Sequence, residues 1–223
     1  FGDGSGSATT TKTGSNKITV LLKLNIATSQ TLAAGTGTWT IDGGGVGALG
    51  EIKMVASGSN HTCALKTDGS RVYCWGNNAA GQLGNNSTTQ SSVPVKVLGL
   101  SGTGYLGDGT NGGPISSIST GANFSCALKN DGSRVYCWGG DDNGELGNGT
   151  EGDSLVPAEV LGLSSTGYMG DGTNGGPISS ISSNQFHSCV LKTDGSRVYC
   201  WGNNWAGQIG INNTTTPQTV PVQ

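Results

Sequence analysis

The chain has 223 residues, of which 41 are glycine and 11% are charged, with a net charge of −3. This composition excludes a helical bundle, because glycine costs about 1 kcal/mol at each interior helix position. No basic cluster and no run of about 18 apolar residues is present, so we expect neither nucleic acid as a partner nor membrane insertion.

Residues 1–50 are predicted to form an N-terminal arm, and Phe1 reads as a mature or trimmed terminus. Residues 1–16 are rich in Gly, Ser and Thr, which is typical of a flexible linker. Every second residue of 17–26 is apolar, from Ile18 to Ile26, which places these side chains on one face and predicts a half-buried strand. Residues 37–41 are a second candidate strand. We expect the strand at 17–26 to pair with a sheet edge, in its own chain or in a neighbouring copy.

Three near-identical segments follow the arm, at an interval of 63 residues. CALKTDGSRVYCWG begins at Cys63, CALKNDGSRVYCWG at Cys126 and CVLKTDGSRVYCWG at Cys189. Such self-similarity indicates duplication of one supersecondary unit. We place the units at residues 52–114, 115–177 and 178–223.

Each unit is predicted to contain four short antiparallel strands. In the first unit we expect strands at 63–66, 71–75 and 93–97, and a strand at 115–118 that leads into the next unit. Asp68-Gly69 is a strong signal for a two-residue hairpin turn. Four short strands match the size of a propeller blade, so the predicted fold is all-β and built of propeller-like blades.

The longer pattern GSNHTCALKTDGSRVYCWGNNAAGQLG at 58–84, which recurs at 121–147 and 183–210, resembles the regulator-of-chromosome-condensation repeat. The resemblance covers roughly residues 52–223 and implies a β-propeller, which has seven blades in that family. This chain departs from the family by having three units, a cysteine pair in each unit, and Gly-rich insertions at 101–114 and 164–177. No residues specific to the family's nucleotide exchange on a small nuclear GTPase are recognisable.

Three blades are too few for a ring of the family's size, so we expect an incomplete or open propeller. Three interpretations remain open. The chain is a fragment of a longer propeller, it closes a small assembly with its own N-terminal strands, or it is completed by neighbouring copies.

The six cysteines form one pair in each repeat. They are Cys63, Cys74, Cys126, Cys137, Cys189 and Cys200. A two-residue turn places Cys63 opposite Cys74 as a hydrogen-bonded pair, with Cα atoms about 5.5 Å apart, which suits a disulfide. Three disulfides within the hairpins are therefore favoured over free buried thiols or a metal site. Because disulfides persist in oxidising compartments, we expect a secreted or cell-surface protein.

His61 and His187 precede the first cysteine of their repeats, and Phe124 stands at the corresponding place of the second repeat, which favours a structural role. An aspartate precedes the glycine of each hairpin and is expected to support the turn. These aspartates are Asp68, Asp131 and Asp194.

No cofactor or metal is expected, although two kinds of acidic segment are weak candidates for Ca²⁺. The densest cluster of oxygen ligands is Asp141, Asp142 and Glu145, for which a solvated loop is the simpler interpretation. Asp108 and Asp171 stand in GDGTNGG, which lacks the alternating acidic ligands of an EF-hand.

The repeated tryptophans Trp75, Trp138 and Trp201 are predicted to lie in the blade core, whereas Trp39 and Trp205 are candidate binding contacts. No catalytic motif is present, so we do not expect an enzyme. The sequence favours an extracellular binding or adhesion scaffold that uses its loops, with other proteins or copies of itself as partners. The alternative is a structural subunit of a filament or sheath, assembled by strand pairing between subunits.

Overall fold

The computed structural model describes residues 9–13, 17–21, 49–172 and 175–223 of a chain that divides into two units, 1–40 and 41–223. In the first unit, β1 (Thr9–Thr13) and β2 (Lys17–Leu21) form an antiparallel hairpin. β2 begins where the sequence predicts a strand. β1 lies in the segment predicted to be a flexible linker, and its run of threonines explains this difference, because β-branched residues favour strands. Residues 22–26 and 37–41 lie outside the described residues.

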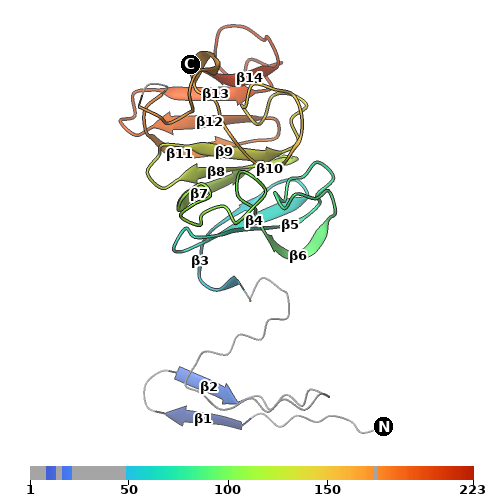
Figure 1. Cartoon of the computed structure of the whole chain (residues 1–223), viewed down its shortest axis with the longest axis vertical. Helices are drawn as coiled ribbons and strands as arrows, with labels where there is room; N and C mark the ends of the chain where they lie inside the picture. The colour runs from blue at the N-terminus through green and yellow to red at the C-terminus, as the bar shows by residue number, and fades with distance from the viewer. Residues whose placement is uncertain (1–8, 14–16, 22–48, 173–174) are drawn as a thin grey trace. The chain divides into compact units, whose positions relative to one another are not determined.

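The second unit contains three four-stranded antiparallel sheets, one in each repeat (Figure 1). The first sheet, blade 1, consists of β3 (Ile52–Ser57), β4 (His61–Lys66), β5 (Val72–Gly76) and β6 (Ser91–Lys96). Blade 2 consists of β7 (Ile115–Thr120), β8 (Phe124–Lys129), β9 (Val135–Gly139) and β10 (Ser154–Glu159). Blade 3 consists of β11 (Ile178–Ser183), β12 (His187–Lys192), β13 (Val198–Gly202) and β14 (Gln218–Val222).

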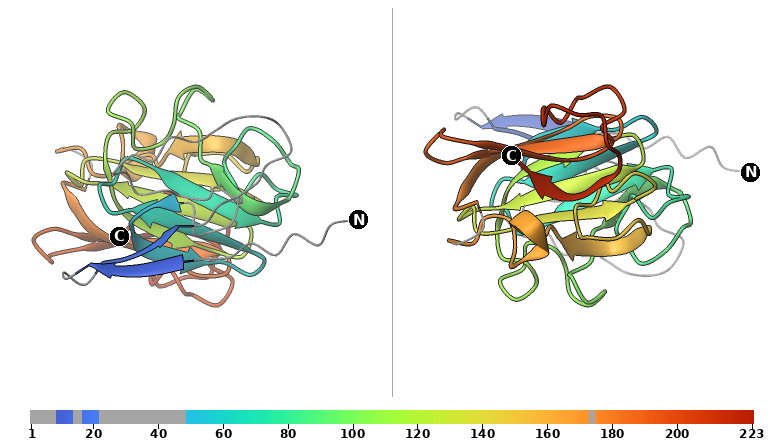
Figure 2. Two further views of the ribbon diagram at one scale, coloured as in Figure 1. Left: turned by 90° about the horizontal axis from the view of Figure 1, so that it is seen from below. Right: turned by 90° about the horizontal axis from the view of Figure 1, so that it is seen from above.

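These sheets confirm the predicted all-β fold of propeller-like blades. The described residues include a 3₁₀ turn, η2 (Leu163–Ser165), and no α-helix, and none of their segments is a helix long and apolar enough to span a membrane. The first strands of successive blades lie side by side, since β7 contacts both β3 and β11 (Figure 2). Blade 3 is complete in strands, because β14 supplies its fourth.

The hairpin between β4 and β5 shows the predicted register with a different turn. Cys63 lies opposite Cys74 as predicted. However, Gly69 N donates to Lys66 O at 3.0 Å and Lys66 N donates to Arg71 O at 3.1 Å, so residues 67–70 form a four-residue loop. The longer loop shifts the alternation of the ladder by one position. The cysteines therefore form the closely spaced, non-hydrogen-bonded kind of pair, with Cα atoms 4.1 Å apart instead of the predicted 5.5 Å.

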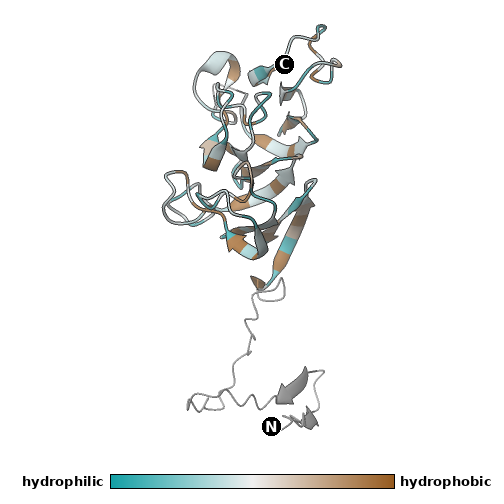
Figure 3. Cartoon of the chain, turned by 90° about the vertical axis from the view of Figure 1, so that its right-hand side faces the viewer, coloured by the Kyte–Doolittle hydropathy of each residue, from teal (hydrophilic) through white to brown (hydrophobic). Residues whose placement is uncertain are grey.

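The core lies between neighbouring blades, and the same repeat positions build both layers. Hydrophobic and hydrophilic residues alternate along the strands, so each sheet buries apolar side chains against the next (Figure 3). The layer between blades 1 and 2 contains Leu65, Val72, Leu83, Val97, Leu106, Ile115, Ile118, Ala127, Tyr136 and Trp138. The layer between blades 2 and 3 contains Phe124, Leu128, Val135, Leu146, Val160, Met169, Ile178, Val190, Tyr199 and Trp201.

The Gly-rich insertion at 101–114 is a structured segment that contributes to this core. An antiparallel bridge pairs Leu98 with Tyr105, and the next residue, Leu106, is fully buried between blades. Asp108 holds this segment closed, because its carboxylate accepts hydrogen bonds from Tyr105 N at 2.9 Å and Asn111 N at 2.8 Å. These bonds lower the pKa of Asp108, so the carboxylate stays ionised.

Candidate interaction surface

The loops of the three blades gather at two opposite edges. At one edge, which we call the loop face, the turn after the first strand of each blade lies beside the long loop after its third strand. This face comprises residues 58–60, 77–90, 121–123, 140–153, 184–186 and 203–217. Backbone hydrogen bonds of 2.8–2.9 Å join the two loops of each blade, from Asn77 N to Asn60 O, Gly140 N to Asn123 O and Asn203 N to Phe186 O.

The opposite edge, which we call the hairpin edge, carries the hairpin turns and the insertions. Arg71 and Lys96 stack on the ring of Tyr105 at 4.8 and 4.7 Å from its centroid, and Arg134 stacks on Tyr168 at 4.8 Å. Sequence reasoning missed the two tyrosines. Their recurrence at the 63-residue interval, in segments otherwise made of small residues, is the signal that would have found them.

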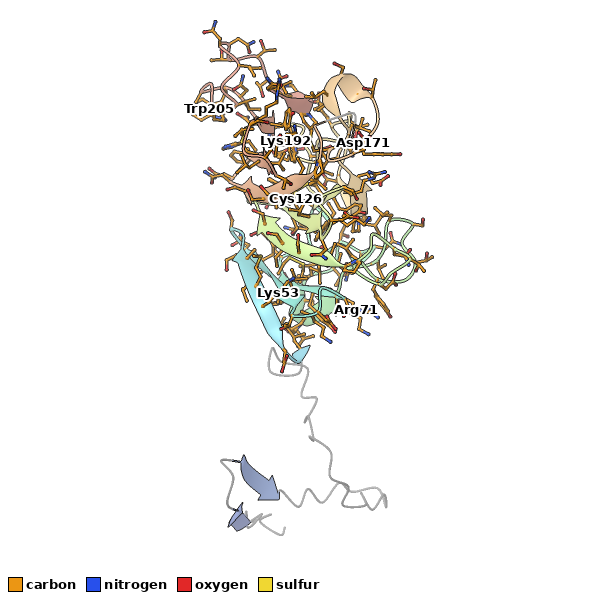
Figure 4. All side chains as sticks on the ribbon, turned by 90° about the vertical axis from the view of Figure 1, so that its left-hand side faces the viewer. Lys53, Arg71, Cys126, Asp171, Lys192 and Trp205 are labelled. Carbon is orange, nitrogen blue, oxygen red and sulfur yellow. A yellow bond between two sulfur atoms is a disulfide. The ribbon has the colours of Figure 1, made fainter. Side chains whose placement is uncertain are left out.

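Charge is distributed unequally between these edges. The segments of the loop face contain no Lys or Arg, and they contain five acidic residues, Asp141, Asp142, Glu145, Glu151 and Asp153. The labelled Arg71 lies on the opposite side of the blades from Trp205 (Figure 4). The loop face is therefore acidic around blade 2.

Asp141 is buried, and the expectation of a solvated loop is wrong at this position. Its Oδ1 accepts a hydrogen bond from Leu146 N at 2.9 Å, while its Oδ2 is buried with no partner among the described residues. Burial raises the pKa of Asp141 to about 7, and the nearby carboxylates of Glu145, Asp153 and Glu151 act in the same direction. The carboxyl group therefore keeps its proton well above the pH at which an exposed aspartate loses it.

The other two repeats show what this position normally does. Asn78 stands there in blade 1, and its Nδ2 donates to Ser87 O at 2.7 Å and to Thr89 O at 3.0 Å. Asn204 stands there in blade 3, and its Nδ2 donates to Asn213 O at 2.9 Å. The side-chain amide of asparagine therefore closes the long loop in blades 1 and 3. In blade 2, Asp141 has a carboxylate oxygen where asparagine has this NH₂ donor. Aligning the three repeats would have shown this exchange.

Glu145 is also buried, so the solvated-loop interpretation fails here too. Its carboxylate accepts hydrogen bonds from Asn143 N at 2.7 Å and Asn143 Nδ2 at 2.8 Å, and burial raises its pKa. Asp142 is exposed. No group of three or more His, Cys, Asp or Glu side chains in the described part of the chain is arranged to hold a metal ion. The expectation that the protein needs no cofactor stays a prediction.

One pocket opens where the loops of the three blades meet. It is lined by Ala80, Asn123, Phe124, Gly140, Asp142, Asn143, Glu145, Asp153, Gln185 and Phe186. Its volume is about 60 Å³, whereas sites for small molecules usually hold roughly 300–1,000 Å³. The pocket is therefore a surface dimple suited to a single protruding side chain.

Trp205 is the most prominent apolar side chain of the loop face, with 67% of its surface exposed. It stands in the loop between β13 and β14. The corresponding positions are Ala79 in blade 1 and Asp142 in blade 2, and both are exposed although their blades pack against the next blade. Trp39, the other candidate contact, lies outside the described residues.

Each predicted cysteine pair is joined by a disulfide, Cys63–Cys74, Cys126–Cys137 and Cys189–Cys200. The first two bridges lie in the apolar layers between blades. Trp138 and Trp201 are fully buried there as predicted, whereas Trp75 is partly exposed.

His61 lies close to a serine hydroxyl but in a structural setting. Its Nε2 is 2.8 Å from Ser125 Oγ, and that hydroxyl donates to Gln82 O at 3.0 Å. Because the hydroxyl hydrogen is used on Gln82, His61 Nε2 is the donor of the pair. Both side chains are buried between blades 1 and 2, and burial lowers the pKa of His61 to about 4.

We expect the substitution His61→Phe to preserve stability at pH 8 and to remove an acid sensitivity. A buried neutral histidine binds fewer protons than it does in the unfolded chain, so its contribution to stability is lost as the pH falls from about 6.5 to 4. At about 1.4 kcal/mol per pKa unit, the loss reaches about 3 kcal/mol in the native protein. Phe124 occupies this position in blade 2, so the ring fits. Urea unfolding across this pH range measures the difference.

The half-buried His187, substituted in the same way, should show a smaller effect. Identical pH profiles for the native protein and the His61→Phe variant would contradict the assignment.

Comparison with known proteins accounts for this architecture. The family model named Regulator of chromosome condensation (RCC1) repeat matches residues 70–128 and 133–191, more than half of the chain. The chain belongs to the RCC1-repeat family. A second RCC1 model matches residues 52–82, 115–145 and 178–208, and these matches start at the first residues of β3, β7 and β11.

Relatives of the chain are larger proteins. It is 33% identical to the ultraviolet-B receptor UVR8 of Arabidopsis thaliana over 172 residues, which cover 77% of this chain and 34% of UVR8. It is 32% identical to the human E3 ubiquitin-protein ligase HERC2 over 162 residues, which cover 73% of this chain and 3% of HERC2. The chain therefore spans about a third of UVR8 and a small part of HERC2.

Solved structures agree on the fold. Human WBSCR16 superimposes with a TM-score of 0.59 at 24% identity, covering 77% of this chain and 37% of that protein. Yeast RCC1 (Prp20), solved bound to Kap60, gives a TM-score of 0.59 at 22% identity and covers 77% and 36%. The matched part of this chain therefore spans little more than a third of each of these structures.

Proposed function

We propose that this chain is a non-enzymatic, protein-binding scaffold of a secreted or cell-surface protein, and that its loop face binds basic segments of partner proteins. The observation that carries the proposal is the composition of this face, which joins three exposed acidic residues, Asp142, Glu151 and Asp153, to an exposed tryptophan and contains no Lys or Arg. Such a face attracts cationic partners and repels acidic ones.

Trp205 supplies the apolar part of the proposed contact. Tryptophan is enriched among the residues that dominate binding energy, because a large rigid ring loses little entropy on binding. The dimple beside Asp142 and Asn143 adds a place for one protruding side chain. The acidic residues then steer and orient a basic segment around these two features.

The three hairpin disulfides support a location outside the cytosol, because cytosolic thiols are kept reduced. An adhesive role would follow if the partner belongs to another cell or to the extracellular matrix. RCC1-type structures support protein binding as the general role, since yeast RCC1 was solved bound to Kap60. The proposal does not rest on donation of β2 to another subunit, because β2 is paired with β1.

The test uses fluorescently labelled peptides of matched length, one rich in Arg and Lys and one rich in Asp and Glu. We expect the basic peptide to bind, with an affinity that falls as salt rises, and the acidic peptide not to bind. Neutralising the exposed acids by Asp142→Asn, Glu151→Gln and Asp153→Asn should weaken binding about tenfold or more, which corresponds to about 1.4 kcal/mol. Trp205→Ala should weaken it by a similar factor.

The control changes the net charge equally at the hairpin edge. It combines Glu51→Gln, Asp68→Asn and Asp194→Asn, in which asparagine keeps the oxygen that supports each turn. This variant should bind the basic peptide as the native chain does. Equal weakening by both triple variants would show a general charge effect and would overturn the loop face as the site.

A further inference from the structure

One position at the hairpin edge changes its charge from blade to blade. It lies two residues after the proline of the fourth strand, and it is Lys96 in blade 1, Glu159 in blade 2 and Gln223 in blade 3. A repeated arginine stands directly before the third strand of each blade. These arginines are Arg71, Arg134 and Arg197. The three blades thus show the same pair of positions in three chemical versions.

In blades 2 and 3 the variable residue is an acceptor for the arginine. Arg134 Nε donates to Glu159 Oε1 at 3.2 Å. Arg197 Nη1 donates to Gln223 Oε1. A carboxylate and an amide therefore serve the same purpose, which is to place an oxygen on the guanidinium group. The side chains of these two positions lie close enough to meet at one point.

In blade 1 a second cation replaces this acceptor. Lys96 has donors only, and neither Lys96 nor Arg71 forms an ion pair with any residue that the structure describes. Arg71 Nη1 donates to Ser70 O, but its Nε has no acceptor among the described residues. The same atom of Arg134 reaches Glu159. Blade 1 therefore holds two positive charges where blade 2 holds an ion pair.

The ring of Tyr105 holds the two cations at one place. The guanidinium carbon of Arg71 is 4.8 Å and Lys96 Nζ is 4.7 Å from the centroid of the ring. Each cation is attracted to the ring, but the two like charges repel each other. The carboxylate of Asp108 does not compensate them, because both of its oxygens accept hydrogen bonds within the insertion. An anion that pairs with both cations would remove the repulsion.

This cluster would stay open to solvent in a longer array of blades. Blade 2 has a neighbour on each side, and its equivalent side chains Arg134 and Glu159 still expose 29% and 28% of their surface. The residue after Tyr105, Leu106, is buried in the layer between blades 1 and 2. The cluster therefore lies beside a neighbouring blade that is present, and its exposure does not depend on where the array begins or ends.

We propose that Arg71, Lys96 and Tyr105 form a binding site for a phosphate group, which we call the Tyr105 site. A phosphate monoester carries a charge of about −1.5 to −2 at pH 7, which matches the two cations. Arginine offers it two parallel N–H donors, and lysine adds a point charge. A single carboxylate would neutralise only one of the two cations. We therefore expect unphosphorylated acidic peptides to bind there too weakly to be detected at concentrations that saturate the site with phosphate.

The test uses the full chain at pH 8 and follows the Nε–H signal of Arg71 by nuclear magnetic resonance. Three probes are added in turn, namely inorganic phosphate, a phosphoserine peptide and the same peptide without phosphate. The first two should shift the signal and saturate at one phosphate group per chain, and the third should not. Tighter binding of the phosphopeptide would assign the ligand to a phosphorylated partner, and equal binding would assign it to free phosphate. No shift with either phosphate probe would overturn the proposal.

Two substitutions give blade 1 the residues of the other blades. Lys96→Glu and Lys96→Gln supply Arg71 with an acceptor in its own chain, so both should weaken phosphate binding about tenfold or more. The control Lys66→Gln removes the same charge as Lys96→Gln from the same blade, at a lysine that pairs with Asp68. It should bind phosphate within about twofold of the native chain. A control that loses as much binding as Lys96→Gln would mean that only overall charge matters, and the site would be wrong.

The reverse substitution in blade 2 gives the deciding result. Glu159→Lys places two cations beside Tyr168, as blade 1 does beside Tyr105, because Arg134 already stacks on that ring. This variant should bind two phosphate groups per chain. Glu159 is partly exposed, so the fold should be kept, as thermal unfolding would verify. A folded Glu159→Lys chain that still binds one phosphate group would overturn the proposal. The loop face lies at the opposite edge, so its binding of basic peptides should be the same in all these variants.

Discussion

The substitution Asp141→Asn should stabilise the protein by about 1–3 kcal/mol at pH 8, the usual cost of an unsatisfied buried polar group. Asparagine restores the donor that Asn78 and Asn204 direct at loop carbonyls in the other two blades. It also removes a carboxyl group whose Oδ2 is buried without a partner among the described residues. In a protein of this size the melting temperature should rise by about 2–4 °C for each kcal/mol.

The gain in stability from Asp141→Asn should increase as the pH rises, because the pKa of Asp141 is raised. Burial raises that pKa to about 7, so between pH 4 and 7 the folded chain holds a proton that the unfolded chain has released. The stability that this proton provides is fully present below pH 4 and is lost as the pH rises through 7. The native protein and the variant should therefore be similarly stable at pH 4 and differ most at pH 8.

Thermal unfolding from pH 4 to 8 measures this difference, with the exposed neighbour substitution Asp142→Asn as the control for the loss of one negative charge. That control should leave the melting temperature within about 1 °C, as expected for a surface change. A variant Asp141→Asn that is less stable than the native protein at pH 8 would contradict the argument. It would show that the ionised carboxylate is needed in the folded chain.

The features of the fold that could be predicted from the sequence are those that recur in all three repeats. The 63-residue interval predicted the blades, the register that places Cys63 opposite Cys74, and the buried positions of Trp138 and Trp201. Each follows from local alternation and turn signals that occur three times. The type of cysteine pair was predicted wrongly, because one hydrogen bond, from Gly69 N to Lys66 O, decides the length of the turn.

The burial of Asp141 was not predicted, because burial depends on contacts distant in sequence. A loop rich in Asp, Asn and Gly reads as solvated when it is considered alone. In the fold, the loop covers the end of blade 2 and its backbone must be satisfied internally, as Leu146 N is by Asp141 Oδ1.

The three repeated tryptophans should differ widely in their contribution to stability. Replacing Trp138 with alanine should cost about 3–5 kcal/mol, because the side chain is fully buried between blades 1 and 2. Trp75→Ala should cost clearly less, because Trp75 is partly exposed. Urea unfolding of the two variants and the native chain measures the difference.

The variant Trp138→Phe separates packing from hydrogen bonding. It removes the indole donor to Gln82 O, but this carbonyl still accepts a bond from Ser125 Oγ at 3.0 Å, so it is not left without a partner. We therefore expect Trp138→Phe to cost much less than Trp138→Ala, and the exposed control Trp205→Ala to change stability by no more than about 0.5 kcal/mol. Equal losses for Trp138→Ala and Trp75→Ala would show that the layer between blades 1 and 2 does not carry the stability assigned to it. The order Trp138, then Trp75, then Trp205 follows from how much of each ring a neighbouring blade covers.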